Sequence, residues 1–388
     1  MSRFLIFIGV VVAIIVGVHY YLWARLVRDP QLAPPWRLLA TWALVLLGLS
    51  MPAAMFLSRA RPAAGRLLAW PAFSWMGVMF LLLVVFATTD LLRLVGWAAR
   101  GASKAEVLDP ARRTLVARVI AAASATVVGA LAAIATRAAQ APIDVKRVEV
   151  SLARLPRAHD GLKVVQLSDV HVGSTIGVGF IRDVVAHVNE LSPDIVAITG
   201  DLVDGSVGDL REAVAPLADL RARHGVYFVT GNHEYYSGAA QWMAALPGLG
   251  IRVLSNERVS IGEGADAFDL AGIDDHTAEG FGGVSTTEAL SRALANRDPE
   301  RELVLLAHQP RQFAEATRHR VGLQLSGHTH GGQMWPFTFF VRLVQPFVAG
   351  LHRRGESQIY VSRGTGYWGP PMRLGAPAEI TQIILRRA

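Results

Sequence analysis

The segment Leu162-Lys-Val-Val-Gln-Leu-Ser-Asp-Val-His171 joins a short apolar run to two side chains that can bind a metal. The run from Leu162 to Leu167 is typical of a buried β-strand. Asp169 and His171 follow it directly, and two ligands two positions apart can face one ion from the loop at a strand end. One such pair is more often part of a turn, so its interpretation depends on the rest of the chain.

Four further apolar runs end in the same kind of residue. In an α/β fold, functional side chains gather at the carboxyl ends of strands, so an ordered series of such ends predicts one common site. A purely structural explanation would need a separate reason for each run. The runs and the residues that follow them are 195–199 with Asp201, 226–230 with Asn232 and His233, 303–307 with His308, and 323–325 with His328 and His330.

The part of the chain from Ala141 to Ala388 predicts an α/β domain with layered sheets. Short strand-like runs, each ending in polar residues or glycine, alternate there with stretches of helical periodicity. The expected strands are 148–152, 162–167, 195–199, 226–230, 268–271, 303–307, 323–325 and 358–361, and the expected helices are 180–190, 210–223 and 287–295.

Residues 1–140 predict a membrane anchor of about four transmembrane helices. Three runs without a formally charged side chain, 4–23, 38–57 and 67–89, are each long enough to cross the hydrocarbon core of a bilayer. A fourth run, 119–136, is shorter and rich in alanine, and its alternative is a buried helix. The first run has no cleavage pattern of small residues near its end, so we expect a retained helix and not a signal peptide.

The composition agrees with a chain that meets lipid. Hydrophobic residues make up 52% of the 388 residues, and there is no cysteine, which excludes disulfides, thiolate metal sites and cysteine nucleophiles. The formal charge of +7 comes largely from arginines beside the apolar runs, so we expect membrane lipid and no nucleic acid as a partner. A slight excess of Lys and Arg on one side of the four runs predicts an extracytoplasmic catalytic domain, anchored in a bacterial inner or plasma membrane.

The motifs together resemble one known group of enzymes. The chain is similar to the calcineurin-like metallophosphoesterase superfamily, and within it to the bacterial membrane-associated branch of the YkuE and YaeI type. One departure is Glu234, where many members have Asp after the catalytic His. The motifs are Asp169-x-His171, Gly200-Asp201-Leu-Val-Asp204, Gly231-Asn232-His233-Glu234, His308, Gly327-His328-Thr-His330-Gly-Gly-Gln333, Ser362-Arg363-Gly-Thr-Gly366 and Pro371-Met-Arg373-Leu-Gly375.

This resemblance implies a four-layer α/β/β/α sandwich and a dinuclear metal site. It assigns Asp169, His171 and His330 to the first metal, Asn232, His308 and His328 to the second, and Asp201 to both. A metal-bridging hydroxide would attack the phosphorus in line, and His233 would protonate the leaving oxygen, with an orienting role as its alternative. Mixed carboxylate, amide and imidazole ligands suit Mn, Fe or Zn.

The substrate is less closely defined by the sequence. Arg363 and Arg373 are candidates to bind the substrate phosphate, and structural ion pairs are the alternative. The apolar segment 335–348 predicts either core packing or a rim that faces lipid. We therefore expect a phosphodiesterase or pyrophosphatase that acts on a lipid-linked phosphoester. The alternative class is a non-catalytic membrane scaffold on the same fold, and the sequence does not define the oligomeric state.

Overall fold

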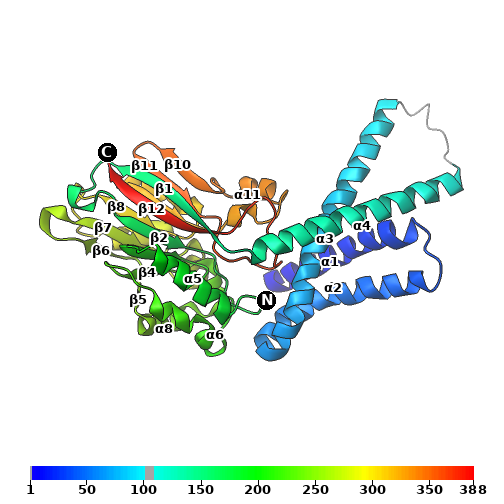
Figure 1. Cartoon of the computed structure of the whole chain (residues 1–388), viewed down its shortest axis with the longest axis horizontal. Coiled ribbons are helices and arrows are strands. Elements are labelled where there is room, and N and C mark those ends of the chain that lie inside the picture. The colour runs from blue at the N-terminus through cyan, green and yellow to red at the C-terminus, as the bar shows by residue number, and fades with distance from the viewer. Residues whose placement is uncertain (1, 101–108) are drawn as a thin grey trace. The chain divides into compact units, whose positions relative to one another are not determined.

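The computed structural model describes residues 2–100 and 109–388, and the chain divides into two compact units (Figure 1). The first unit holds the residues up to Arg137 together with Gly369–Met372. The second holds Ala138–Trp368 and Arg373–Ala388. The sequence placed the change from apolar to globular character near residue 140, close to this division.

The described residues of the first unit form four long apolar helices. Each includes a stretch that is long and apolar enough to cross a membrane, and most side chains of these stretches are not buried within the protein. The alanine-rich fourth run is part of a helix of 31 residues, so all four expected helices are present. The helices are α1 (Ser2–Trp23), which continues into a π-helical turn (Ala24–Arg28), α2 (Trp36–Ala60), α3 (Pro62–Arg100) and α4 (Pro110–Gln140).

Charged groups in this unit pair with one another beside the end of α1. Asp90 lies one residue beyond the uncharged run that the sequence showed in α3. Its carboxylate accepts hydrogen bonds from Tyr21 at 2.6 Å and from Arg25 at 2.5 Å. Arg25 also pairs with Asp29 at 2.9 Å. Pairing of this kind lowers the cost of placing ionised side chains beside apolar helices.

The second unit is built on two six-stranded sheets. Strands β2 to β5 run parallel in the first sheet, and β7, β8, β9 and β11 run parallel in the second. In spatial order, the first sheet is β1 (Asp144–Leu152), β12 (Glu379–Arg387), β2 (Lys163–Leu167), β3 (Ile195–Thr199), β4 (Val226–Val229) and β5 (Ile251–Val253), and the second is β10 (Gly350–Arg354), β11 (Ser357–Val361), β9 (Leu323–Ser326), β8 (Leu303–Leu306), β7 (Phe268–Gly272) and β6 (Glu257–Ile261).

Three apolar cores show that this unit has four layers, as the resemblance implied. Alternation along β2 sends Val165 and Leu167 to the core shared with helices, and Val164 to the core between the two sheets. A third core joins the second sheet to another pair of helices. The helices are α5 (Val178–Glu190), α6 (Val207–Val214) and α8 (Ala239–Ala245) on the first sheet (Figure 1), and α9 (Thr286–Ala293) and α10 (Phe313–Ala316) on the second.

Phe268 provides a test of the core between the sheets, where its side chain is fully buried. We expect Phe268→Ala to lower the free energy of unfolding of this unit by about 3–5 kcal/mol, because the lost ring leaves a cavity between two rigid sheets. Denaturant unfolding of the full-length protein in detergent measures the change. Phe281→Ala is the matched control, since that ring is 57% exposed, and an equal loss in both variants would contradict the assignment of the core.

Candidate metal centre

The seven expected ligand residues lie at the carboxyl ends of five strands, β2, β3 and β4 of one sheet and β8 and β9 of the other. Backbone hydrogen bonds join the loops that carry them. The amide of Asp169 donates to Gly200 at 3.1 Å, and the amide of His171 donates to Asp201 at 3.1 Å. On the second sheet, the amide of Gly327 donates to His308 at 2.9 Å. The amide of His328, on the second sheet, donates to Asp169 Oδ1, on the first, at 2.8 Å, so the two sheets deliver their polar ends to one place.

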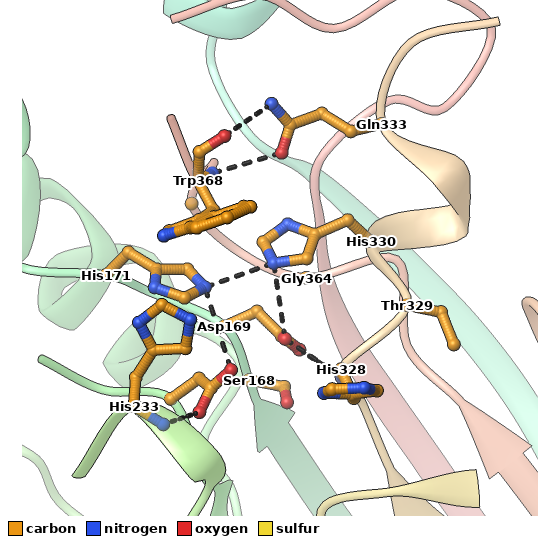
Figure 2. Close-up of polar contacts among 12 residues, drawn as sticks. Ser168, Asp169, His171, His233, His328, Thr329, His330, Gln333, Gly364 and Trp368 are labelled. Atoms are coloured by element: carbon orange, nitrogen blue, oxygen red, sulfur yellow. Dashed lines mark hydrogen bonds and ion pairs between the residues drawn. The ribbon is translucent and has the colours of Figure 1, made fainter. Parts of the chain in front are cut away.

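The first group of potential ligands consists of Asp169, His171 and His330, all of which are buried. One ligand atom from each lies within 4.8 Å of the others. The Nε2 atoms of the two imidazoles are 3.0 Å apart, and His330 Nε2 is 3.4 Å from Asp169 Oδ1 (Figure 2). The resemblance assigned the same three residues to one metal.

The second group consists of Asp201, His308 and His328, and Asn232 lies beside it. His308 Nε2 is 3.0 Å from Asp201 Oδ2, and His328 Nδ1 is 2.9 Å from Asn232 Oδ1. The same oxygen of Asp201 is 3.9 Å from His171 Nε2, which belongs to the first group. Asp201 therefore lies between the two groups.

The donor atoms fit divalent cations. Two imidazole nitrogens at 3.0 Å can share only one proton, whereas a cation can accept both lone pairs. His308 donates through Nδ1 to the Thr199 carbonyl at 2.8 Å, which leaves Nε2 as its ligand atom. This arrangement is usual for metal-binding histidines, whose second nitrogen is held by a backbone or carboxylate oxygen.

The electrostatics of the centre favour positive charge next to Asp201. Burial alone would raise the pKa of Asp201, but the adjacent His308 outweighs it and holds that pKa well below its ordinary range. Conversely, burial would lower the pKa of His308, and the Asp201 carboxylate raises it well above normal. Burial lowers the pKa of His328 to about 3 and that of His330 well below normal, which keeps both imidazoles neutral and able to donate a lone pair.

Five of the expected ligands have a left-handed backbone, a conformation that residues with a side chain rarely adopt. Such conformations cost free energy and persist only where the surrounding contacts fix them, and they are common at functional sites. The residues and their φ angles are Asp169 (52°), His171 (55°), Asp201 (50°), His328 (71°) and His330 (51°).

Two glycines allow the loops to approach these ligands closely. A Cβ atom at Gly231 would lie 2.2 Å from Asp201 Oδ1, and one at Gly327 would lie 2.1 Å from Asp169 Oδ2. Neither space admits a methyl group. The glycines that the sequence placed beside the ligands are thus required by contact with the carboxylates.

Glu234 fixes the loop that carries Asp201. Its carboxylate is fully buried and accepts four backbone N–H groups. Oε2 accepts from Asp201 at 3.0 Å and Gly231 at 2.6 Å, and Oε1 accepts from Leu202 at 2.8 Å and Val203 at 3.2 Å. The residue that departs from the common motif is therefore a positioning residue for Asp201.

Asp204 and His233 form a second polar pair at the edge of the centre. Asp204 Oδ1 accepts hydrogen bonds from Nδ1 of His171 at 3.2 Å and from Nδ1 of His233 at 2.5 Å. Burial opposes protonation of His233, but Asp201 and Asp204 outweigh it and raise the pKa of the imidazole to about 9. Proximity also groups His233 with His171 and Asp201, so distance alone allows it to act either as a ligand or as an acid.

The two arginines expected to bind substrate differ in their surroundings. Arg373 is fully buried and donates to the carbonyls of Gly366 at 2.9 Å, Ala376 at 2.9 Å and Arg363 at 2.9 Å. These contacts favour a structural role for Arg373, with backbone carbonyls as partners instead of the ion pair that was the alternative from the sequence. Arg363 pairs with Glu379 at 3.0 Å, and 35% of its side chain is exposed, so it stays within reach of a ligand.

Trp368 is a residue at the centre that the sequence analysis did not identify. Its indole packs edge to face with His233 at 5.4 Å between ring centroids, and 52% of the residue is exposed. Gln333 accepts from the Trp368 amide at 3.0 Å and donates to its carbonyl at 2.9 Å (Figure 2). Gln333 belongs to a recognised motif, but no local pattern marks a tryptophan 35 residues later.

Comparison with known proteins gives the family. Residues 162–332 match the family model of the calcineurin-like phosphoesterases. A Danio rerio protein named transmembrane protein with metallophosphoesterase domain is 36% identical over 401 aligned residues, which cover 100% of this chain and 90% of that protein. The chain belongs to the calcineurin-like phosphoesterases. It is a metallophosphoesterase, a hydrolase of phosphoric ester bonds, which agrees with the enzyme interpretation of the sequence.

Two other relatives add to this assignment. A Bos taurus protein of the same name is 38% identical over 387 aligned residues, covering 95% of this chain and 86% of that protein. The uncharacterized metallophosphoesterase YkuE of Bacillus subtilis is 31% identical over 242 residues, covering 60% of this chain and 82% of that protein. The resemblance to YkuE is therefore confirmed, and the similarity to the two transmembrane proteins includes the apolar helices.

Glu234→Gln tests the clamp on the Asp201 loop. In this variant an amide NH₂ replaces one carboxylate oxygen and cannot accept hydrogen bonds, so two of the four backbone N–H groups lose their acceptor. We expect the loop to loosen and metal affinity to fall by about 10–100-fold, as is typical when groups that orient a ligand are lost. Metal titration of the full-length protein measures the change. Glu212→Gln, on the exposed surface of α6, is the control, and unchanged affinity in Glu234→Gln would exclude a positioning role.

Proposed function

We propose that this metallophosphoesterase hydrolyses its substrate with two divalent cations that share Asp201. The observation that carries the proposal is the place of Asp201 between the two ligand groups. Asp169, His171 and His330 would hold one cation, and Asn232, His308 and His328 the other. Mn, Fe or Zn would suit these ligands. Bound there, the two cations would supply Lewis acidity that activates a water for in-line attack and neutralises charge on the phosphoryl oxygens.

His233 is the group that we assign to protonation of the leaving oxygen. Asp204 holds Nδ1, so the proton available to a substrate is the one on Nε2. Burial opposes protonation of the imidazole, whereas Asp201 and Asp204 raise its pKa. Bound cations would offset the effect of Asp201, and the contact with Asp204 would still favour the protonated form that a general acid requires. The side chain of His233 is 15% exposed, whereas that of His171 is 1% exposed, so His233 is the more accessible of the two imidazoles that share Asp204.

The proposed substrate is a phosphodiester or pyrophosphate carried by a lipid. A general acid is most useful where the leaving group is a poorly stabilised alkoxide, as in a phosphodiester. Two observations support the lipid part. The relatives that cover nearly the whole chain are named transmembrane proteins, and much of the apolar segment after His330, which contains Trp335, Phe340 and Leu343, is exposed to solvent instead of packing on the domain core.

The membrane orientation is also a proposal. We infer that the four apolar helices span a bacterial inner or plasma membrane. The second unit, which we call the catalytic unit, would face away from the cytoplasm, because the slight excess of Lys and Arg lies on the opposite side of the membrane. One of the basic residues that make up this excess, Lys104, lies outside the residues that the structure describes.

Asp201→Ala tests the shared ligand. We expect the metal content of the purified protein to fall from about two ions per chain to one or fewer, and phosphoesterase activity to fall to background, because one carboxylate serves both cations. Elemental analysis and assays of phosphomonoesters, phosphodiesters and lipid-linked substrates, each with Mn, Fe and Zn, measure both effects. Asp183→Ala, at an exposed position of α5, is the control. Full activity in Asp201→Ala, or an active wild type without metal, would exclude the proposed centre.

His233→Ala tests whether His233 acts as a general acid or binds a metal. We expect unchanged metal content and a loss of about 10²–10⁴-fold in kcat on alkyl phosphodiesters, with a much smaller loss on nitrophenyl esters, whose leaving group needs no proton. An acid works in its protonated form, so the wild-type rate on alkyl esters should fall as pH rises through the pKa of His233. That fall should occur at or below about pH 9, since bound cations disfavour the imidazolium, and it should be absent from His233→Ala. Loss of metal from this variant would identify His233 as a ligand.

A further inference from the structure

The catalytic unit exposes a cluster of large apolar side chains that begins shortly after His330 in the sequence. This cluster, called here the α11 patch, lies on helix α11 (Thr338–Val344) and on the residues just before it. Singly exposed apolar residues are common on proteins, but a contiguous group of them usually marks an interaction site. Its members and their exposed fractions are Trp335 (55%), Phe337 (48%), Phe339 (56%), Phe340 (58%), Leu343 (82%) and Val344 (64%).

Helix α11 turns its apolar side outward. Val341 is buried, and so is Gln345 at the end of the helix. Phe339, Phe340 and Leu343 occupy positions on another side of the same short helix and are more than half exposed. A helix that only covered the domain core would show the opposite pattern. The apolar side is therefore available to a partner.

The charge around the patch fits an anionic surface. The stretch of 20 residues from Trp335 to Arg354 contains no Asp or Glu, and its charged residues are Arg342, Arg353 and Arg354. All three arginines are exposed. One of the arginines, Arg342, lies on α11 itself. A segment that combines aromatic and aliphatic side chains with arginine and lacks acidic residues is typical of the interface of a bilayer with anionic lipid headgroups.

A bilayer is the partner that the chain keeps within reach. Four helices of the first unit can cross a membrane, and α4 ends at Gln140. Strand β1 begins at Asp144, so only three residues, Ala141–Ile143, separate helix from sheet. Three residues span about 10 Å at full extension. The catalytic unit therefore cannot move far from the end of α4, whereas any other partner would have to be recruited.

The patch is joined to the loop of a proposed metal ligand. Thr338, the first residue of α11, donates from Oγ1 to the Gly331 carbonyl at 3.3 Å. A Cβ atom at Gly332 would lie 2.5 Å from the Thr338 Cα, so the helix packs directly on the turn that follows His330. The first residue of α11 therefore lies against the edge of the metal centre, while the exposed side chains of the patch point elsewhere.

We propose that the α11 patch docks on the surface of a bilayer, with its aromatic and aliphatic side chains at the acyl boundary and Arg342, on the same helix, on anionic headgroups. Docking itself is independent of the proposed function. Its consequence, that the scissile phosphate is presented from the plane of the membrane, rests on that function.

The absence of cysteine from the chain allows a direct test with single-cysteine variants. The full-length protein would carry an environment-sensitive nitrobenzoxadiazole label at Leu343→Cys and be placed in nanodiscs with about 30 mol% anionic lipid. Ser291→Cys, on the exposed surface of α9, is the matched control. We expect quenching by spin-labelled lipid to be at least about threefold stronger at position 343 than at position 291, and quenching by aqueous iodide to be weaker.

Two outcomes would overturn the proposal. Equal quenching by iodide at both positions would show that the α11 patch stays in water. Protection of position 343 from both iodide and lipid quenchers would show that a protein surface covers it, whether a second copy of the chain or another part of the same one.

A double variant, Phe340→Ser with Leu343→Ser, separates docking from catalysis. We expect KM for a phosphodiester presented in vesicles to rise at least about tenfold, while kcat/KM for a soluble nitrophenyl phosphodiester stays within about twofold of wild type. Equal KM values on vesicles would contradict a role in presentation. A wild type that cleaves neither substrate would refute the proposed function, and the quenching measurement would still decide whether the patch docks.

Discussion

The arrangement of the site depends on the contacts of the buried Asp201 carboxylate. This carboxylate lies 3.0 Å from His308 on the second sheet and accepts the backbone N–H of His233 at 2.8 Å on the first. Glu234 in turn clamps the loop that carries it. A buried charge is costly unless it is paired and hydrogen-bonded, so the polar ends of both sheets must converge on it. The apolar cores set the layers, and this carboxylate sets how their ends meet.

The sequence predicted the central strands because each is a short apolar run that stops at a polar residue. Strands β3 and β8 lie where such runs were expected. Strands β5, β6 and β10 lie at or near sheet edges and carry exposed polar residues, so no run marks them. Strand β12 was also missed, although Ile380, Ile383 and Leu385 make it an apolar run of the same kind. Its insertion between β1 and β2, from the far end of the chain, is a long-range pairing that no local pattern predicts.

The candidate site shows the same division. The sequence predicted that the candidate ligand residues would meet at one site, because the chemistry of each residue and its place after a strand are both local properties, and the structure brings them close together. Their division between two metals comes from the resemblance and stays a prediction. It did not predict that Asp204 would hold two imidazoles, that Arg373 would be surrounded by carbonyl groups, or that Trp368 would lie beside His233. Each of these facts depends on contacts between distant parts of the chain. The left-handed backbone of the ligands is equally a product of the assembled loops.

The three-residue connection between α4 and β1 has a consequence for how reaction rates depend on concentration. An enzyme held this close to a bilayer would meet a substrate in the same membrane by lateral diffusion in two dimensions. Its rate would follow the mole fraction of substrate among the lipids instead of the amount per volume of solution. Diluting the membrane with inert lipid would then slow the reaction, whereas diluting the whole suspension with buffer would leave it unchanged.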